Sequence, residues 1–127
     1  MAPECQVAFG LSTRARLEDR GQAMSDKSPP PDDCSTMEEV RAGVDAIDGE
    51  ILRLLARRFA YMRAAARIKP EREAVRDEAR KSEVIANAVA RAGELDIPGA
   101  TIAEIWDRLV EGSIAYELEE WDRVRGG

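Results

Sequence analysis

Histidine is absent from the 127-residue sequence, which removes the commonest general base and the commonest metal ligand. The two cysteines, Cys5 and Cys34, have no partner at metal-site spacing and do not form a disulfide framework. A glycine-rich phosphate loop is also missing. We therefore expect neither a metal nor a cofactor, and an enzyme with this sequence has to work by positioning, by electrostatics or through carboxylates.

The sequence also lacks an excess of basic residues and a long apolar run. It has 19 basic and 25 acidic residues and a formal charge of −6, whereas a general nucleic-acid binder carries a basic face. No apolar run approaches the roughly 18–20 residues of a membrane span, and the start has no apolar region typical of a signal peptide. We expect a cytoplasmic protein that binds neither nucleic acid nor a membrane.

Serine, proline, glycine and charged residues dominate the first 33 residues, which end in Ser-Pro-Pro-Pro-Asp-Asp. This composition is typical of disorder, so residues 1–33 are predicted to form a disordered N-terminal tail. Residues 34–127 show helical periodicity, without a strand pattern or a repeat. They are expected to form one helical domain with a modest core, and the predicted fold class is all-α with three helices per chain.

The first predicted helix is unusually long. Two capping-box patterns at residues 35–39 mark its start, and Pro70 ends it after Lys69, because the residue before a proline is pushed out of the helical region. Its roughly 33 residues correspond to about 50 Å. The other two helices, at about residues 77–92 and 100–124, are too short to cover it. This mismatch indicates a partner helix from another chain.

Two cations stand on the apolar stripe of this helix, which runs through Val40, Val44, Ile47, Ile51, Leu54, Arg58, Met62, Ala65 and Lys69. Arg58 and Lys69 point the same way, roughly 16 Å apart along the axis. Buried cations need partners. A small polyanion between the first and second helices would satisfy both, with Arg80 as a third cation. Alternatively, the two side chains extend to solvent or pair with acids from the other helices.

A carboxylate stands on the apolar face of the third helix, which runs through Trp106, Val110, Ser113, Ile114, Glu117 and Trp121. Glu117 either pairs with one of the cations or, when protonated, donates a hydrogen bond to the ligand. The two tryptophans are expected to pack in the core.

Three segments combine these residues into a recognisable pattern. MEEVRAGVDAIDGEILRLLARRFAYMRAAARIK contains R-x16-R-x10-K, VRDEAR contains V-x-D-x-x-R, and IWDRLVEGSIAYELE contains a Ser with a Glu four residues later. The combination resembles the all-helical (AroQ-type) chorismate mutases over about residues 34–125. The residues that match that family's motifs are Arg41, Arg58, Lys69, Asp77, Arg80, Ser113 and Glu117.

Two positions differ from the usual pattern of that family. Lys81 stands where a Glu commonly contacts the substrate hydroxyl, and Glu117 replaces the Gln of many bacterial members, as in the fungal branch. The segment PDDCSTMEEVRAGVDAID resembles the isochorismate pyruvate lyases, a branch of the same fold that often lacks the Glu at the position of Lys81. Ser113 and the preceding W-x-x-L-V-E instead resemble the mutases.

The resemblance implies an intertwined helical homodimer with shared active sites. It implies chorismate, a dicarboxylate, as the substrate, and a pericyclic rearrangement to prephenate that needs no base, nucleophile or metal. Lys69, Glu117 and Arg58 are the implied catalytic residues, and the remaining substrate-binding residues are Arg41, Asp77, Arg80 and Ser113. The alternatives are an isochorismate pyruvate lyase, which yields salicylate and pyruvate, and an inactive helical dimerisation or regulatory module.

Arg41 is expected to serve the active site of the other protomer. It lies 17 residues before Arg58, which is roughly 25 Å along one helix and about 100° around it. An Arg side chain does not span that distance to a ligand as small as chorismate. If both arginines touch one substrate, as the resemblance implies, Arg41 comes from the second chain. Otherwise it pairs with Asp45 on the surface.

Overall fold

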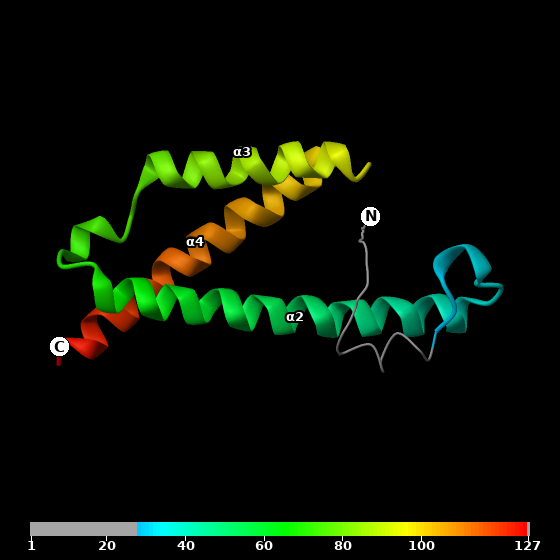
Figure 1. Cartoon of the computed structure of the whole chain (residues 1–127), viewed down its shortest axis with the longest axis horizontal. Helices are drawn as coiled ribbons and strands as arrows, with labels where there is room; N and C mark the ends of the chain where they lie inside the picture. Colours follow the sequence, from blue (N-terminus) through cyan, green and yellow to red (C-terminus); the bar gives the residue numbers. More distant parts are fainter. Residues whose placement is uncertain (1–27, 127) are drawn as a thin grey trace. The chain divides into compact units, whose positions relative to one another are not determined.

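The computed structural model describes residues 28–126, and this part of the chain is helical and contains no strand. Figure 1 shows its elements in chain order: the 3-10 helix η2 (Pro31–Asp33), α2 (Met37–Ile68), the 3-10 helix η3 (Arg72–Ala74), α3 (Glu78–Glu94) and α4 (Gly99–Val124). The all-α prediction with a long first helix is therefore confirmed. The predicted tail lies outside the described residues except for its last part, residues 28–33, which contains η2.

A capping box begins α2, as one of the two patterns at residues 35–39 predicts. The Glu39 backbone N–H donates to Thr36 Oγ1 at 3.1 Å, and the Thr36 N–H donates to Glu39 Oε1 at 3.2 Å. These reciprocal bonds satisfy two of the backbone donors that the start of a helix leaves free. Backbone N–H groups, first that of Ser35, also lower the pKa of the Glu39 carboxyl.

The described chain divides into two compact units, one that ends at Ala56 and one that begins at Arg57. In the first unit the apolar stripe of α2 is open, because five of its side chains are between 37% and 60% exposed: Val40, Val44, Ile47, Ile51 and Leu54. Side chains of this kind bury most of their surface in stable domains. A contiguous exposed stripe on a helix is typical of a surface that binds another protein.

The second unit contains the buried core. In it, α3 packs against α4 as a helical hairpin (Figure 1). Val75, Val110 and Ile114 form the buried cluster, and Val84, Leu118 and Trp121 pack around it. Trp121 thus contacts the core, as expected. Ala66, near the end of α2, is fully buried and belongs to the same unit.

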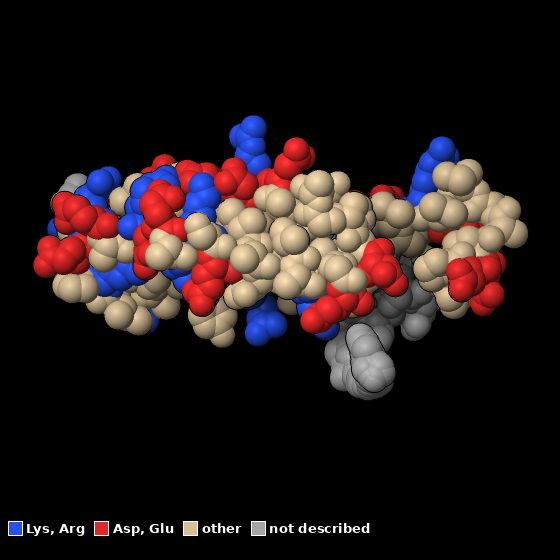
Figure 2. Space-filling view, turned by 90° about the horizontal axis from the view of Figure 1, so that it is seen from above, with Lys and Arg blue, Asp and Glu red and all other residues tan. Residues whose placement is uncertain are grey.

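The surface is mixed in charge on the face that Figure 2 shows, where basic and acidic side chains interleave rather than gather by sign. Within residues 28–126, no helix is both long enough and apolar enough to cross a membrane.

Candidate active site

Arg58 is fixed toward α4 by a buried hydroxyl. Its Nη1 donates to Ser113 Oγ at 2.7 Å, and the Ser113 hydroxyl donates in turn to the Leu109 carbonyl at 2.7 Å. Ser113 is buried and Arg58 is half-buried. Within residues 28–126, the other N–H groups of Arg58 have no hydrogen-bond acceptor. Because Ser113 accepts from only one of its nitrogens, the Arg58 guanidinium still has N–H donors that can bind a carboxylate.

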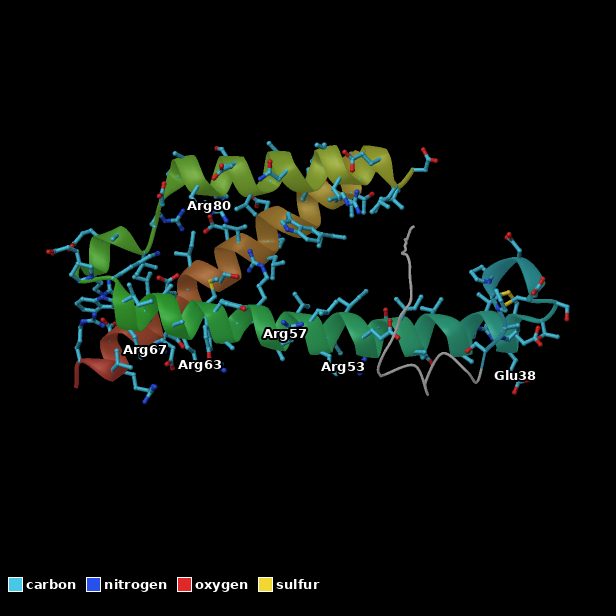
Figure 3. All side chains as sticks on the ribbon, viewed as in Figure 1. Glu38, Arg53, Arg57, Arg63, Arg67 and Arg80 are labelled. Carbon is cyan, nitrogen blue, oxygen red and sulfur yellow. The ribbon has the colours of Figure 1, made fainter. Side chains whose placement is uncertain are left out.

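Arg80, on the first turns of α3 (Figure 3), adds a second positive charge near Arg58. Burial, and after it the charge of Arg80, lower the pKa of the Arg58 guanidinium. Arginine nevertheless remains charged at any physiological pH. Arg80 itself pairs with Glu83 at 2.8 Å, but that pair is well exposed and contributes little stability. Two neighbouring cations with one weak surface partner favour the binding of an anion.

Asp77 fixes the turn that carries Arg80. Its Oδ1 accepts the backbone N–H of Arg80 at 3.0 Å, which makes Asp77 the N-cap residue of α3. Losing such a cap typically costs about 1 kcal/mol. Asp77 is expected from the sequence among the substrate-binding residues, and the contact that the structure shows is this cap.

Lys69 and Glu117 form an ion pair at the other end of the site. Lys69 Nζ lies 2.9 Å from Glu117 Oε2, and the two side chains are 30% and 5% exposed. The atoms are close but poorly aligned, so Oε2 is a buried oxygen without a hydrogen-bond partner within residues 28–126. We interpret the contact as an ion pair without a proper hydrogen bond. Of the two alternatives for Glu117, the structure contains the pairing with a cation.

The two pairs converge on one turn of α4. Arg58 on α2 and Lys69 directly after its end are eleven residues apart, but their partners Ser113 and Glu117 are only four apart on α4. Residues four apart on a helix lie one above the other on the same face. Two long cationic side chains therefore reach toward the same small buried surface.

Lys81 is held by acids of α4. Its Nζ lies 2.6 Å from Glu111 Oε2 and 3.1 Å from Asp107 Oδ1, and Arg76 binds the same Glu111 at 2.8 Å. Arg76 first, and then Lys81, lower the pKa of Glu111 to about 2. Glu111 and Asp107 in turn raise the pKa of Lys81. The position where the enzymes that the sequence resembles commonly have a Glu thus carries a Lys in an ion-pair network.

Arg41 lies in the first unit and its side chain is exposed. Within the described residues, no ion pair joins it to Asp45, the surface partner considered above. The structure therefore brings Arg58, Lys69, Arg80, Ser113 and Glu117 into the second unit, with Asp77 at the base of Arg80. No group of three or more acidic or cysteine side chains within residues 28–126 is arranged to hold a metal ion.

Sequence reasoning missed two features of this region. The Lys81 network has a signal, because Asp107 and Glu111 are four residues apart and form one acidic row on α4. The second feature is the set of bonds to the Lys69 carbonyl. Trp121 Nε1 donates to it at 3.0 Å and Arg125 Nη2 at 2.7 Å. No periodicity in the sequence predicts a bond from a side chain to a distant backbone carbonyl.

Comparisons with known proteins identify the family of the chain. Residues 40–118 match the family model described as chorismate mutase type II. The chain is also 26% identical over 96 residues to an isochorismate pyruvate lyase of Pseudomonas aeruginosa, and this alignment covers 76% of the chain and 95% of that protein. The matched family segment contains every residue that the sequence analysis assigns to the site.

Proposed function

The chain belongs to the chorismate mutase type II family, and from this membership we propose that it is a chorismate mutase, which rearranges chorismate to prephenate. In this reaction the ether C–O bond of the substrate breaks while a C–C bond forms within the same molecule. No proton, electron pair or leaving group passes to the protein. The observation that carries the proposal is the convergence of Arg58 and Lys69 on the buried turn that holds Ser113 and Glu117.

The substrate's two carboxylates would bind to guanidinium groups. Arg58 uses the donors that Ser113 leaves free, and Arg80 approaches from α3. Bidentate binding of a carboxylate by Arg fixes orientation as well as charge. In this proposal Asp77 acts through the position of Arg80. Holding the flexible substrate in its compact, reactive conformer is a large part of catalysis in a reaction within one molecule.

Lys69 and Glu117 would face the ether oxygen. Negative charge develops on this oxygen as the C–O bond breaks, so the Lys69 ammonium stabilises the transition state more than the bound substrate. Glu117 Oε2 is buried without a hydrogen-bond partner in the described residues. Protonation gives this carboxyl an O–H group, which can donate a hydrogen bond to the ether oxygen. Preorganised donors in a buried site cost no reorganisation during the reaction.

A homodimer with shared active sites completes the proposal. The apolar stripe of the first unit is exposed along five side chains of α2, which is the pattern expected of a helix that pairs with a second copy. In such a dimer, Arg41 of the second copy supplies the remaining guanidinium for the substrate's carboxylates. Each of the two sites would then contain residues of both chains.

The second candidate function is that of an isochorismate pyruvate lyase, in which the same ether bond breaks and a ring hydrogen moves to the departing pyruvate carbon. The relative from Pseudomonas aeruginosa favours it. So does Lys81, because it replaces a residue that commonly contacts the substrate hydroxyl, and chorismate and isochorismate differ in the place of that hydroxyl. Lys81 also fits a third function, that of a helical dimerisation module without catalytic activity.

One assay separates these three functions. The purified full-length chain is incubated with chorismate and, separately, with isochorismate, and the products are quantified by chromatography. Prephenate from chorismate supports the mutase, and salicylate with pyruvate from isochorismate supports the lyase. If neither appears above the uncatalysed rate, the chain is not an enzyme of either kind. The Lys69→Ala variant is run alongside to show that any product comes from this site.

A further inference from the structure

The end of α2 lies beside the end of α4 in the second unit (Figure 1). The helix ends at Ile68, and Lys69 is followed by Pro70, so the chain turns away directly after the candidate catalytic Lys. The last carbonyls of a helix have no partners within it. The Lys69 N–H still donates to the Ala65 carbonyl at 2.9 Å, but the Lys69 carbonyl depends on groups outside α2.

Two side chains of the last turn of α4 and its cap supply those partners. Trp121 Nε1 donates to the Lys69 carbonyl at 3.0 Å, and Arg125 Nη2 donates to the same oxygen at 2.7 Å. Arg125 Nη1 also donates to the Ala66 carbonyl at 3.0 Å, one turn earlier on α2. The Arg125 guanidinium stacks over the Trp121 ring, with its carbon 4.1 Å from the ring centre. We call this group of two side chains the α2 clamp.

We propose that the α2 clamp is a positioning device for Lys69, so that Trp121 and Arg125 contribute to turnover without touching the substrate. This inference rests on the proposed function. A Lys side chain is long and flexible, and only its backbone end can be anchored without using the ammonium. The clamp holds that end with two donors, while the ammonium stays 2.9 Å from Glu117 Oε2. A displacement of about 1 Å in a reacting group costs up to about 100-fold in rate.

The alternative is that the clamp only stabilises the fold. A positive charge near a helix C-terminus is favourable by itself, and Arg–Trp stacking adds to this. Loss of either effect lowers the melting temperature, but neither effect changes the position of Lys69 in particular. A stabilising role alone leaves turnover unchanged at temperatures well below melting, whereas a positioning role lowers turnover there.

The test uses Arg125→Ala and Trp121→Phe in full-length chains with and without Lys69→Ala. Phe keeps an aromatic ring beneath Arg125 and removes the indole donor. In the wild-type background we expect Arg125→Ala to lower kcat about 10-fold, and Trp121→Phe to lower it by about 3-fold, with KM changed by less than about 2-fold. In the Lys69→Ala background, Arg125→Ala should have less than about a 2-fold further effect, because residues that act through one group are not additive.

Arg123→Ala is the matched control. Arg123 lies in the same last turn of α4 and is 68% exposed, and it pairs with Glu120 at 2.9 Å rather than with α2. Its replacement should leave kcat unchanged. The inference is overturned if Arg125→Ala lowers kcat equally with and without Lys69, or if kcat stays at the wild-type value at temperatures well below melting.

A second readout does not depend on activity. The sequence has three lysines, Lys27, Lys69 and Lys81, so isotope labelling of lysine gives three side-chain signals in an NMR spectrum. Arg125→Ala should shift the Lys69 signal. The Lys81 signal should not move, because Lys81 is paired with Glu111 of α4 and not with the clamp. If the wild-type chain converts neither substrate, the proposed function fails, and the spectrum still decides the role of the clamp. An unmoved Lys69 signal contradicts the positioning role.

Discussion

The two units of the chain use the same helix face in different ways. In the first unit the stripe of α2 is apolar and exposed, as at Ile47, which is 55% exposed. In the second unit the stripe carries Arg58 and Lys69, and both have partners on α4 within the same chain. Within residues 28–126, the apolar part is thus left exposed, whereas the charged part is paired with groups of α4. This difference is the basis for proposing two partners, a second copy of the chain for the apolar part and a small dicarboxylate for the charged part.

The largest effect should come from placing a charge on the apolar part of the stripe. We expect Ile47→Asp to give a monomer in size-exclusion chromatography with light scattering, because burying an unpaired carboxylate in a helix interface costs several kcal/mol. Activity should fall below about 1% of wild type, since each site then lacks its second chain. Ala42→Asp adds the same charge to an exposed residue away from the stripe and is the control. A dimeric, active Ile47→Asp variant would show that this stripe does not form the dimer.

Lys69→Ala should have the next largest effect, and it acts on the charged part of the stripe. We expect a loss of turnover equivalent to about 2.7 kcal/mol or more, as for removal of an oxyanion donor. Ground-state binding should change much less, because the developing charge is present only as the bond breaks. Steady-state kinetics with chorismate measure both. Arg91→Ala, an exposed cation that pairs with Glu94 in the last turn of α3, is the control. A raised KM with unchanged turnover would make Lys69 a plain carboxylate anchor.

Glu117 should tolerate replacement by glutamine. A neutral donor at this position can bond to the ether oxygen, whereas a carboxylate there repels the developing charge. Glu117→Gln keeps a donor, so turnover of chorismate should be retained, and Glu117→Ala, which removes it, should lower kcat. Steady-state kinetics of both variants measure the difference. If the Gln variant is inactive, Glu117 serves as an ion-pair partner of Lys69 instead.

The smallest effect concerns the acid stability of the Lys81 network. Arg76 and Lys81 lower the pKa of Glu111 from 4.5 to about 2. A carboxyl whose pKa is lower in the folded state adds stability above its unfolded pKa, and this stability is lost as the pH falls from about 4.5 toward 2. Glu111→Gln should have a slightly lower melting temperature than the wild type at neutral pH. This difference in melting temperature should disappear as the pH falls from about 4.5 toward 2. The gap stays modest because the pairs are partly exposed. A gap that does not change with pH would contradict this role.

The sequence predicts the helices well because their ends depend on local chemistry. The capping pattern at Thr36 and Glu39 and the proline after Lys69 place the ends of α2 to within about two residues, and Asp77 caps α3 at the predicted boundary. The same local rules predict that Arg58 and Lys69 share one face. Periodicity alone does not say what lies opposite that face, which is why pairing with acids and binding of an anion stayed open as alternatives.

The contacts between helices were less predictable. The bonds from Trp121 and Arg125 to the Lys69 carbonyl depend on how α4 crosses α2, and the separation of 52 positions between Lys69 and Trp121 leaves no local pattern. A tryptophan on an apolar face predicts core packing, which is confirmed for Trp121, but not the direction of its indole N–H. The pairing of Lys81 with Glu111 similarly needs the register between α3 and α4.

The central claim is that a site in the second unit is completed by Arg41 of a second copy, and subunit mixing tests it directly. Arg41→Ala and Arg58→Ala homodimers should each be nearly inactive. Equal amounts are unfolded together and refolded, and differently tagged chains are used to confirm heterodimers. Each heterodimer then has one site with both lesions and one with none.

With random pairing, half of the dimers are heterodimers with one intact site of two, so the mixture should recover about a quarter of wild-type activity. The KM of the recovered activity should equal that of the wild type, because the active sites are intact. If heterodimers form and the mixture remains as inactive as its parents, Arg41 and Arg58 act within one chain, and the shared-site account is wrong.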